Sequence, residues 1–218
     1  MKIKVCGMKF PENMQEVASL RPDYLGFIFW EPSPRYFSGS LPELPDHIRK
    51  VGVFVDAPIP YILEKTRDHS LDMIQLHGDE SPDFCISLKE ELSTVIEHEK
   101  GRKGPTGVVK AFAVDKSFSF DSLRSYEPGV DYFLFDSKGP LPGGNGFAFD
   151  WSLLEGYTLN TPFFLSGGIG MAETENLRHF LKTPLAEKCH AIDVNSGFEV
   201  RPGLKDPSRL QTFIKKIM

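Results

Sequence analysis

Eight short apolar runs, each suited to a β-strand, alternate along this chain with stretches whose apolar residues recur at helical spacing. Continuous apolar runs are typical of parallel strands, because such strands are buried on both faces. Eight repeats within 218 residues predict an α/β fold, a single (β/α)8 TIM-barrel domain spanning residues 1–218. A doubly wound open sheet is the rival architecture, although it typically has fewer strands. The runs are Ile3–Cys6, Tyr24–Phe29, Val51–Val55, Met73–Leu76, Val108–Ala113, Tyr132–Phe135, Pro162–Leu165 and Ala191–Val194.

The helical stretches between these runs are short. One segment, Thr94–Gly107, disturbs the alternation. Within it, Val95 and Ile96 either extend the preceding helix or form a stray strand, and the charged, glycine-rich remainder is typical of a surface loop. The expected helices are Pro11–Leu20, Pro45–Arg49, Ile59–Asp68, a helix near Pro82–Leu92, Phe120–Ser125, Trp151–Leu154, Ala172–Leu181 and Pro207–Ile217.

Charge and cysteine content limit the functional classes. A net charge of −5 argues against a nucleic-acid partner, although a local nest of amides can still hold an anion. The three cysteines form no CxxC pair, so we expect a reducing cytoplasm and no disulfide framework. The first residues lack the pattern of a signal peptide, and no apolar run has transmembrane length, which predicts no membrane partner. The histidines other than His77 show no metal-ligand spacing.

Two loops rich in glycine and small polar residues follow the last two predicted strands, Leu165–Ile169 and Asp193–Gly197. Glycine lets backbone N–H groups approach an anion closely. In a barrel of this kind, the loops after the last two strands are a frequent phosphate site. The pair therefore predicts a small phosphorylated ligand.

Cys6 and Asp136 each stand at the end of a predicted strand, where catalytic groups of such barrels lie. A lone cysteine is often a small buried hydrophobe, but this position favours a reactive thiolate whose pKa nearby cations or amides lower. Asp136 either caps the following segment or acts as a general acid in a partly desolvated site. The adjacent glycine-rich loop, Lys138–Gly146, is suited to cover the mouth and exclude water. Cys85 and Cys189 end no strand and are interpreted as packing residues.

Three further polar side chains follow predicted strands. Arg35 lies in a stiff loop between Pro34 and Tyr36, where it is either simply solvated or holds a carboxylate with its planar fork. Gln75 and His77 stand at the end of the fourth run, and we interpret His77 as a supporting residue that orients its loop.

Taken in order, these residues resemble the phosphoribosylanthranilate isomerase family of tryptophan biosynthesis. Any one of the matching motifs is short and unspecific, but eight in register over the whole chain are highly specific. The motifs are Lys4–Gly7, Ser33–Tyr36, Gly52–Val55, Gln75–Gly78, Phe135–Ser137, Gly143–Gly146, Leu165–Ile169 and Asp193–Glu199.

The resemblance implies a (β/α)8 barrel without metal or cofactor that performs an Amadori rearrangement, the third step of tryptophan synthesis from chorismate. The reaction converts N-(5-phosphoribosyl)anthranilate into 1-(2-carboxyphenylamino)-1-deoxyribulose 5-phosphate. By motif, Cys6 is the general base, Asp136 the general acid, and Arg35 the group that holds the anthranilate carboxylate. Asp193 contacts the sugar hydroxyls or sets the state of Cys6. The residues expected to bind substrate are Arg35, Gln75, His77, Gly144, Gly167, Gly168, Asp193, Asn195, Ser196 and Gly197.

This chain departs from the commoner family pattern at two positions. Asn195 stands where a serine is usual, and Asn145 where threonine or serine is usual. An amide can still donate to a phosphate oxygen, so we expect phosphate binding to survive. Two alternatives remain at this point: another sugar-phosphate barrel enzyme, such as an epimerase or a histidine-pathway isomerase, or a barrel that binds a phosphorylated metabolite without turnover. The assembly is expected to be a monomer or homodimer, and Phe118 and Phe120 either mark an interface or pack under a loop.

Overall fold

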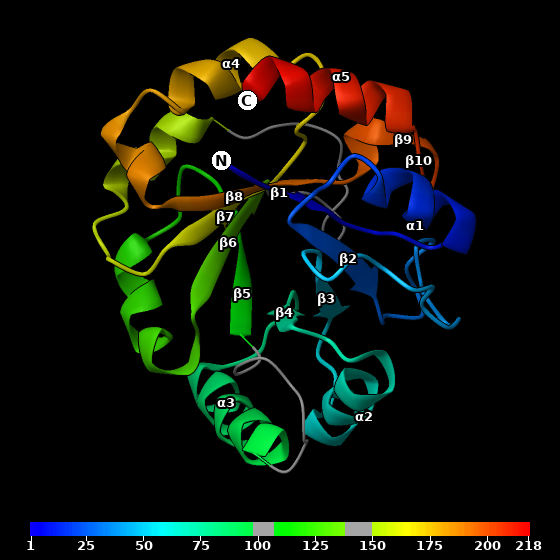
Figure 1. Cartoon of the computed structure of the whole chain (residues 1–218). Helices are drawn as coiled ribbons and strands as arrows, with labels where there is room; N and C mark the ends of the chain where they lie inside the picture. The colour runs from blue at the N-terminus through cyan, green and yellow to red at the C-terminus, as the bar shows by residue number, and fades with distance from the viewer. Residues whose placement is uncertain (98–106, 138–149) are drawn as a thin grey trace.

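The computed structural model describes residues 1–97, 107–137 and 150–218. Eight parallel strands close into a barrel, each paired with the next and β8 paired with β1, and the helices lie outside the ring (Figure 1). The predicted TIM barrel is confirmed, and the doubly wound sheet was the wrong alternative. The strands are β1 (Lys2–Val5), β2 (Tyr24–Ile28), β3 (Arg49–Phe54), β4 (Met73–Leu76), β5 (Gly107–Val114), β6 (Tyr132–Ser137), β7 (Phe163–Leu165) and β8 (Cys189–Val194).

Five α-helices and five 3₁₀ helices are found in the described residues. Proline at the first turn starts α1, α2 and α5, where its missing N–H is not needed. Two stretches predicted as helices are 3₁₀ helices of six residues each, longer than the roughly three to four residues usual for this type of helix. The α-helices are α1 (Pro11–Ala18), α2 (Ile59–His69), α3 (Pro82–Glu97), α4 (Thr174–Phe180) and α5 (Pro207–Ile217), and the 3₁₀ helices are η1 (Phe120–Ser125), η2 (Glu127–Gly129), η3 (Trp151–Gly156), η4 (Pro184–Glu187) and η5 (Ser196–Phe198).

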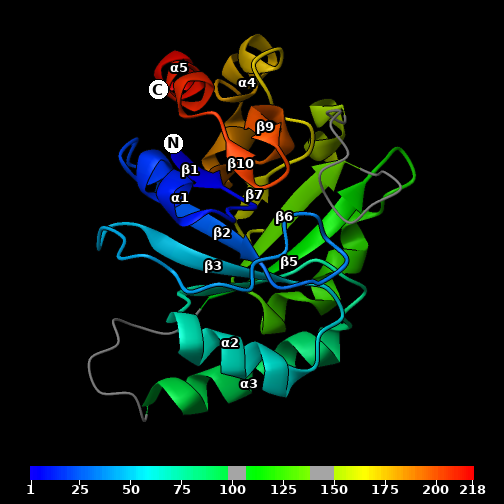
Figure 2. The ribbon, with the colours of Figure 1, turned by 90° about the vertical axis from the view of Figure 1, so that its right-hand side faces the viewer.

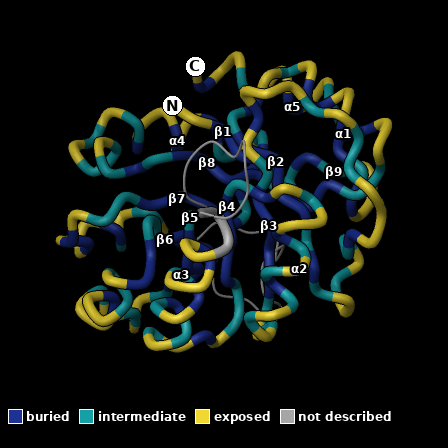
Figure 3. The backbone as a smooth tube through the Cα atoms, turned by 60° about the horizontal axis from the view of Figure 1, so that its bottom comes forward, coloured by how far each residue is buried: buried dark blue, intermediate teal, exposed yellow. Residues whose placement is uncertain are grey.

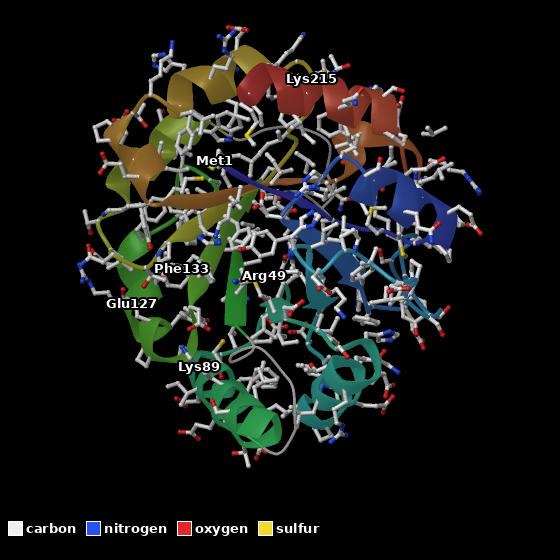
Figure 4. All side chains as sticks on the ribbon, in the orientation of Figure 1. Met1, Arg49, Lys89, Glu127, Phe133 and Lys215 are labelled. Carbon is white, nitrogen blue, oxygen red and sulfur yellow. The ribbon has the colours of Figure 1, made fainter. Side chains whose placement is uncertain are left out.

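Alternate strand residues face the barrel interior and the helices. The interior core is a separate cluster, and the larger core lies between strands and helices. In Figure 3 the strands are mainly dark blue, and the exposed stretches lie mainly at the periphery. The side chains of Arg49, at the start of β3, and of Lys215, on α5, mark the ring of strands and the outer layer in Figure 4. The interior cluster comprises Tyr24, Val51, Met73, Val109, Ala111, Leu134, Phe164 and Ala191.

The helix predicted over Pro45–Arg49 is wrong. Residues 46–48 form a turn, and Arg49 already belongs to β3. Arg49 is already paired with Tyr24 of β2, so too few residues remain between Pro45 and the strand for a helix. A cavity of about 1120 Å³ lies between this connection and residues of α2, and none of the predicted site residues lines it.

A small antiparallel ribbon after β8 has no counterpart among the predicted strands. It pairs β9 (Glu199–Arg201) with β10 (Leu204–Lys205) across a turn in which Gly203 has a φ of +84°. Figure 2 shows the ribbon beside α1 and below α5. Lys205 is tied to α1, because its backbone N–H donates to Asn13 Oδ1 (2.8 Å) and its carbonyl accepts from Asn13 Nδ2 (2.9 Å). The ribbon thereby fixes Glu199 and Lys205 close to the barrel mouth.

Three remaining expectations concern the periphery. Val95 and Ile96 extend a helix, since α3 continues to Glu97, while the rest of that segment up to residue 106 lies outside the described residues. Phe118 and Phe120 pack partly buried against the outer core. No helix in the described ranges combines the length and hydrophobicity needed to cross a bilayer.

Candidate active site

The carboxyl ends of the strands surround a pocket that contains most of the predicted site residues. Gly144 and the Lys138–Gly146 loop lie outside the described residues. The pocket lining also includes Ile28, Trp30, Val53 and Val55, which give it an apolar wall. The predicted residues that the structure brings together there are Cys6, Arg35, Gln75, His77, Asp136, Gly167, Gly168, Asp193, Asn195, Ser196 and Gly197.

The two glycine-rich loops lie against each other. A side chain at Gly197 would collide with the carbonyl oxygen of Ile169. Gly167 and Gly168 have φ values of +89° and +63°, a conformation that favours glycine. Within the described residues their backbone N–H groups have no hydrogen-bond partner. The loops therefore present free donors suited to an anion.

Cys6 follows β1 directly, and its backbone N–H donates to the carbonyl of Val194 at 2.9 Å. A Cβ atom on Gly26 would come within 2.8 Å of the Cys6 Sγ, so the missing side chain in β2 makes room for the thiol. Burial raises the pKa of the Cys6 thiol. The ammonium groups of Lys4 and Lys205 oppose this rise, and Asp193 adds to it. The expected cations are present, but the expected lowering of the thiol pKa is wrong, because the effect of burial is larger than theirs.

Lys4 and Asp193 form a buried ion pair beneath Cys6. The Lys4 Nζ donates to Asp193 Oδ2 at 2.9 Å, and the two side chains are 1% and 5% exposed. Burial lowers the pKa of Lys4, but the adjacent charge of Asp193 prevails and holds the pKa above its ordinary value. Burial also raises the pKa of the Asp193 carboxyl, and the Lys4 ammonium opposes this rise.

Asp136 belongs to a short polar chain that also contains His77 and Gln75. Asp136 Oδ2 lies 3.4 Å from His77 Nε2, and the Gln75 amide nitrogen lies 2.8 Å from His77 Nδ1. Asp136 Oδ1 accepts from the backbone N–H of Ser137 at 2.8 Å. Asp136 therefore caps the backbone of the next residue with Oδ1, as one of the two interpretations expects. Its Oδ2 faces His77. His77 lies between the other two, and its role in orienting its loop stays a prediction.

Several buried polar atoms around the mouth have no partner in the described part of the chain. They are Gln75 Oε1, Ser137 Oγ and Asp193 Oδ1. Leaving such atoms unpaired costs about 1–3 kcal/mol each. A ligand rich in hydroxyl groups is suited to supply the missing partners.

Arg35 is not simply solvated, because its side chain is 13% exposed and its fork holds Glu199. Arg35 Nε lies 2.9 Å from Glu199 Oε1, and Arg35 Nη2 lies 2.7 Å from Oε2. Lys205 Nζ donates to Glu199 Oε1 (2.7 Å) and to Asn195 Oδ1 (2.6 Å). The carbonyl oxygen of the Asn195 side chain thus faces a lysine. Its expected role toward phosphate depends on the amide nitrogen.

The sequence interpretation assigned no role to Lys4, Gly26, Glu199 and Lys205. A lysine inside an apolar run, as in Ile3-Lys4-Val5, is the one signal that could have indicated a buried partner. Cys85 and Cys189 are buried without a disulfide, as interpreted. The part of the chain that the structure describes contains no cluster of three or more His, Cys, Asp or Glu residues suited to a metal.

Comparison with known proteins gives one consistent family. The family model of N-(5′-phosphoribosyl)anthranilate (PRA) isomerase matches residues 3–216. The N-(5′-phosphoribosyl)anthranilate isomerase of Parabacteroides distasonis is 42% identical, covering 100% of this chain and 94% of that protein. The corresponding isomerase of Phocaeicola vulgatus is 38% identical, with coverage of 100% and 98%.

Solved structures of the same family are similar in fold. The phosphoribosyl anthranilate isomerase of Thermus thermophilus has a TM-score of 0.79 at 26% identity, covering 100% of this chain and 98% of that one. A phosphoribosyl anthranilate isomerase in complex with reduced 1-(o-carboxyphenylamino)-1-deoxyribulose 5-phosphate has a TM-score of 0.75 at 28% identity, with the same coverage.

Proposed function

Since the chain belongs to the N-(5′-phosphoribosyl)anthranilate isomerase family, we propose that Cys6 and Asp136 share the acid–base work of that reaction. The protein is a phosphoribosylanthranilate isomerase of tryptophan biosynthesis. Its substrate is a small phosphorylated molecule, in keeping with the phosphorylated ligand bound to a similar isomerase. The whole chain acts as one barrel domain in this proposal.

The observation that carries the proposed roles is the placement of Cys6 and Asp136 at one mouth. They line the same pocket from β1 and β6. Asp136 protonates the furanose ring oxygen, which opens the ring to a Schiff base. Cys6, as thiolate, then removes the proton from the sugar carbon next to the imine, and the resulting enolamine tautomerises to the ketone.

The remaining pocket groups bind the two ends and the middle of the substrate. Arg35 holds the anthranilate carboxylate through Nη1, because Nε and Nη2 of its planar fork are already engaged by Glu199. The free N–H groups of Gly167 and Gly168 hold the phosphate together with Ser196 and Gly197. Unpaired oxygens of Gln75 and Asp193 face the ribose hydroxyls in the middle. Gly144 is assigned to phosphate binding from the Gly143–Gly146 motif alone.

Substitution of the acid and the base tests these roles. We expect Cys6→Ala and Asp136→Asn each to lower kcat by about 10²–10⁴-fold while the fold is kept, because each removes one proton-transfer group. Turnover is followed by the loss of anthranilate-type fluorescence when protein meets freshly prepared phosphoribosylanthranilate.

The matched controls are Cys85→Ala, a buried cysteine in α3, and Asp121→Asn, an exposed aspartate in η1. Both should keep kcat close to that of the wild type. Near-wild-type turnover in Cys6→Ala or in Asp136→Asn would sink the corresponding assignment.

A further inference from the structure

Two buried lysines, Lys4 and Lys205, act on the Cys6 thiol, and they differ in how far a carboxylate neutralises their charge. Lys4 has a carboxylate of its own, Asp193, at 2.9 Å. Lys205, whose side chain is fully buried, shares its carboxylate, because Glu199 also holds Arg35. The charged groups that face Cys6 are Lys4 on β1, Asp193 on β8 and Lys205 on β10.

The Arg35–Glu199–Lys205 group carries a surplus positive charge. One carboxylate lies within 2.9 Å of two cationic side chains, and all three are largely buried. Arg35 and Lys205 hold Glu199 ionised, because their hydrogen bonds and charges outweigh the effect of burial and keep its pKa below the ordinary value. Burial lowers the pKa of Lys205 to about 8, so this ammonium keeps its proton at neutral pH. Two cations therefore face one anion.

Two side chains in contact with this group, Asn195 and the Arg35 stem, lie against Gly7, the residue that follows Cys6. A Cβ atom on Gly7 would come within 2.7 Å of Asn195 Oδ1 and 2.8 Å of Arg35 Cδ. The same Asn195 oxygen accepts from Lys205 Nζ at 2.6 Å. Asn195 and Arg35 therefore pack onto the residue next to the thiol, and Asn195 bridges that residue to Lys205. Being an uncharged amide, Asn195 leaves the surplus charge unchanged.

We propose that Lys205 is a positioning residue for the reaction: its incompletely neutralised ammonium stabilises the thiolate form of Cys6. A charge held in a buried site acts strongly on a neighbouring ionisable group, because little solvent screens it. The Lys205 ammonium opposes the rise that burial causes in the pKa of the Cys6 thiol, as the Lys4 ammonium also does. The inference rests on the proposed role of Cys6 as the base.

The rate at which iodoacetamide alkylates Cys6 at pH 7 measures its thiolate fraction without any turnover. The substrate-free protein is used, and the Cys6 peptide is quantified by mass spectrometry. We expect Lys205→Met and Asn195→Asp each to slow alkylation about tenfold, since each cancels the surplus charge and so lowers the thiolate fraction of Cys6. One substitution removes a cation and the other adds an anion.

Charge-preserving variants separate this role from simple packing. Lys205→Arg and Asn195→Ser disturb the same contacts but keep the charge, so alkylation should stay within about threefold of the wild type. The matched control is Lys110→Met, which removes a buried lysine paired with Glu80 at 3.2 Å on the outer side of β5 and should leave Cys6 unchanged.

The inference is overturned if Asn195→Asp alkylates at the wild-type rate, even where Lys205→Met does not fold. It is also overturned if the charge-preserving variants slow alkylation as much as the charge-changing ones. Turnover in Cys6→Ala decides the proposed function separately, so failure of one does not imply failure of the other.

Discussion

At the amino-terminal end of the barrel the interior is filled by rings, whereas at the carboxyl-terminal end it is filled by charges. Tyr24 and Tyr132 pack edge-on against Phe164, with ring centroids 5.5 and 5.4 Å away. At the other end, Lys4 and Asp193 lie 2.9 Å apart with almost no exposure. Both sets of side chains stand at the strand positions that face the barrel interior.

The difference between the two ends shows that aromatic packing stabilises the barrel, whereas the buried charges serve its chemistry. Ring packing removes apolar surface from water at about 25 cal/mol per Å² and needs no exact charge balance. Buried ion pairs return little net stability, because desolvation offsets much of the attraction. The buried ion pairs Lys4–Asp193 and Lys205–Glu199 lie at the end where a substrate with a carboxylate and a phosphate is proposed to bind.

Removal of Arg35 tests the charged end with the largest effect expected here. We expect Arg35→Ala to raise KM about 10- to 100-fold with a smaller change in kcat, because one charge-assisted grip on the carboxylate contributes about 1.5–3 kcal/mol. Steady-state kinetics measure both constants. Arg124→Ala, which removes an exposed arginine of η1, should leave KM unchanged. An unaltered KM in Arg35→Ala contradicts the clamp.

The strands were predictable because each one is a buried, continuous apolar run, which needs no knowledge of distant partners. All eight lie where the sequence indicates, with ends that differ by a few residues. The location of Cys6 and Asp136 at the mouth was predictable for the same reason, because each stands at the carboxyl end of a strand. The Pro45–Arg49 helix failed because Arg49 is used by the pairing of β3 with β2, a contact between segments that the local pattern does not show.

The ionic network could not be predicted from local pattern. Glu199 and Lys205 lie in short strands of mixed polarity, and the partner of Glu199 is Arg35, 164 residues away in the chain. Nothing in the neighbourhood of either residue indicates that pairing. The role of Asn195 toward Lys205 likewise depends on how the ribbon folds back over β8.

Two glycines in neighbouring strands allow the mouth to be compared with the outer core. Gly26 faces the Cys6 Sγ, whereas Gly52 of β3 faces outward, where a Cβ atom would lie 2.8 Å from the Phe54 ring. We expect Gly26→Ala and Gly52→Ala each to cost about 1–3 kcal/mol of unfolding free energy through overpacking. Gly26→Ala alone should also lower kcat, because the thiol must move.

Urea unfolding and kcat measured on both variants give the comparison. The inward and outward substitutions should agree in stability loss and differ in turnover. A Gly26→Ala protein with wild-type kcat would show that the position of the Cys6 thiol tolerates displacement. Equal losses of kcat in both variants would show that the two faces of the strands are not independent.

The amino-terminal end contributes a smaller, pH-dependent effect through His190. Its Nε2 lies 2.7 Å from the Tyr24 hydroxyl, and its ring contacts Tyr132 with centroids 4.3 Å apart. Burial, together with the charges of Lys2 and Arg49, lowers the pKa of His190 from 6.5 to about 4. Between these values the unfolded chain binds more protons than the folded one, so stability falls as the pH drops from about 6.5 to about 4.

Because His190 is only half-buried, we expect a loss of about 1–2 kcal/mol rather than the full linkage value. His190→Gln keeps an acceptor for the Tyr24 hydroxyl but cannot be protonated, so its unfolding free energy should fall less over this range. Urea unfolding at pH 7 and at pH 4.5 measures the difference, with exposed His179→Gln as the control. If both variants lose as much stability as the wild type, His190 is protonated in the folded barrel without cost. The aromatic amino-terminal end would then bury a charged histidine without losing stability. That result would contradict the proposed difference between the two ends of the barrel.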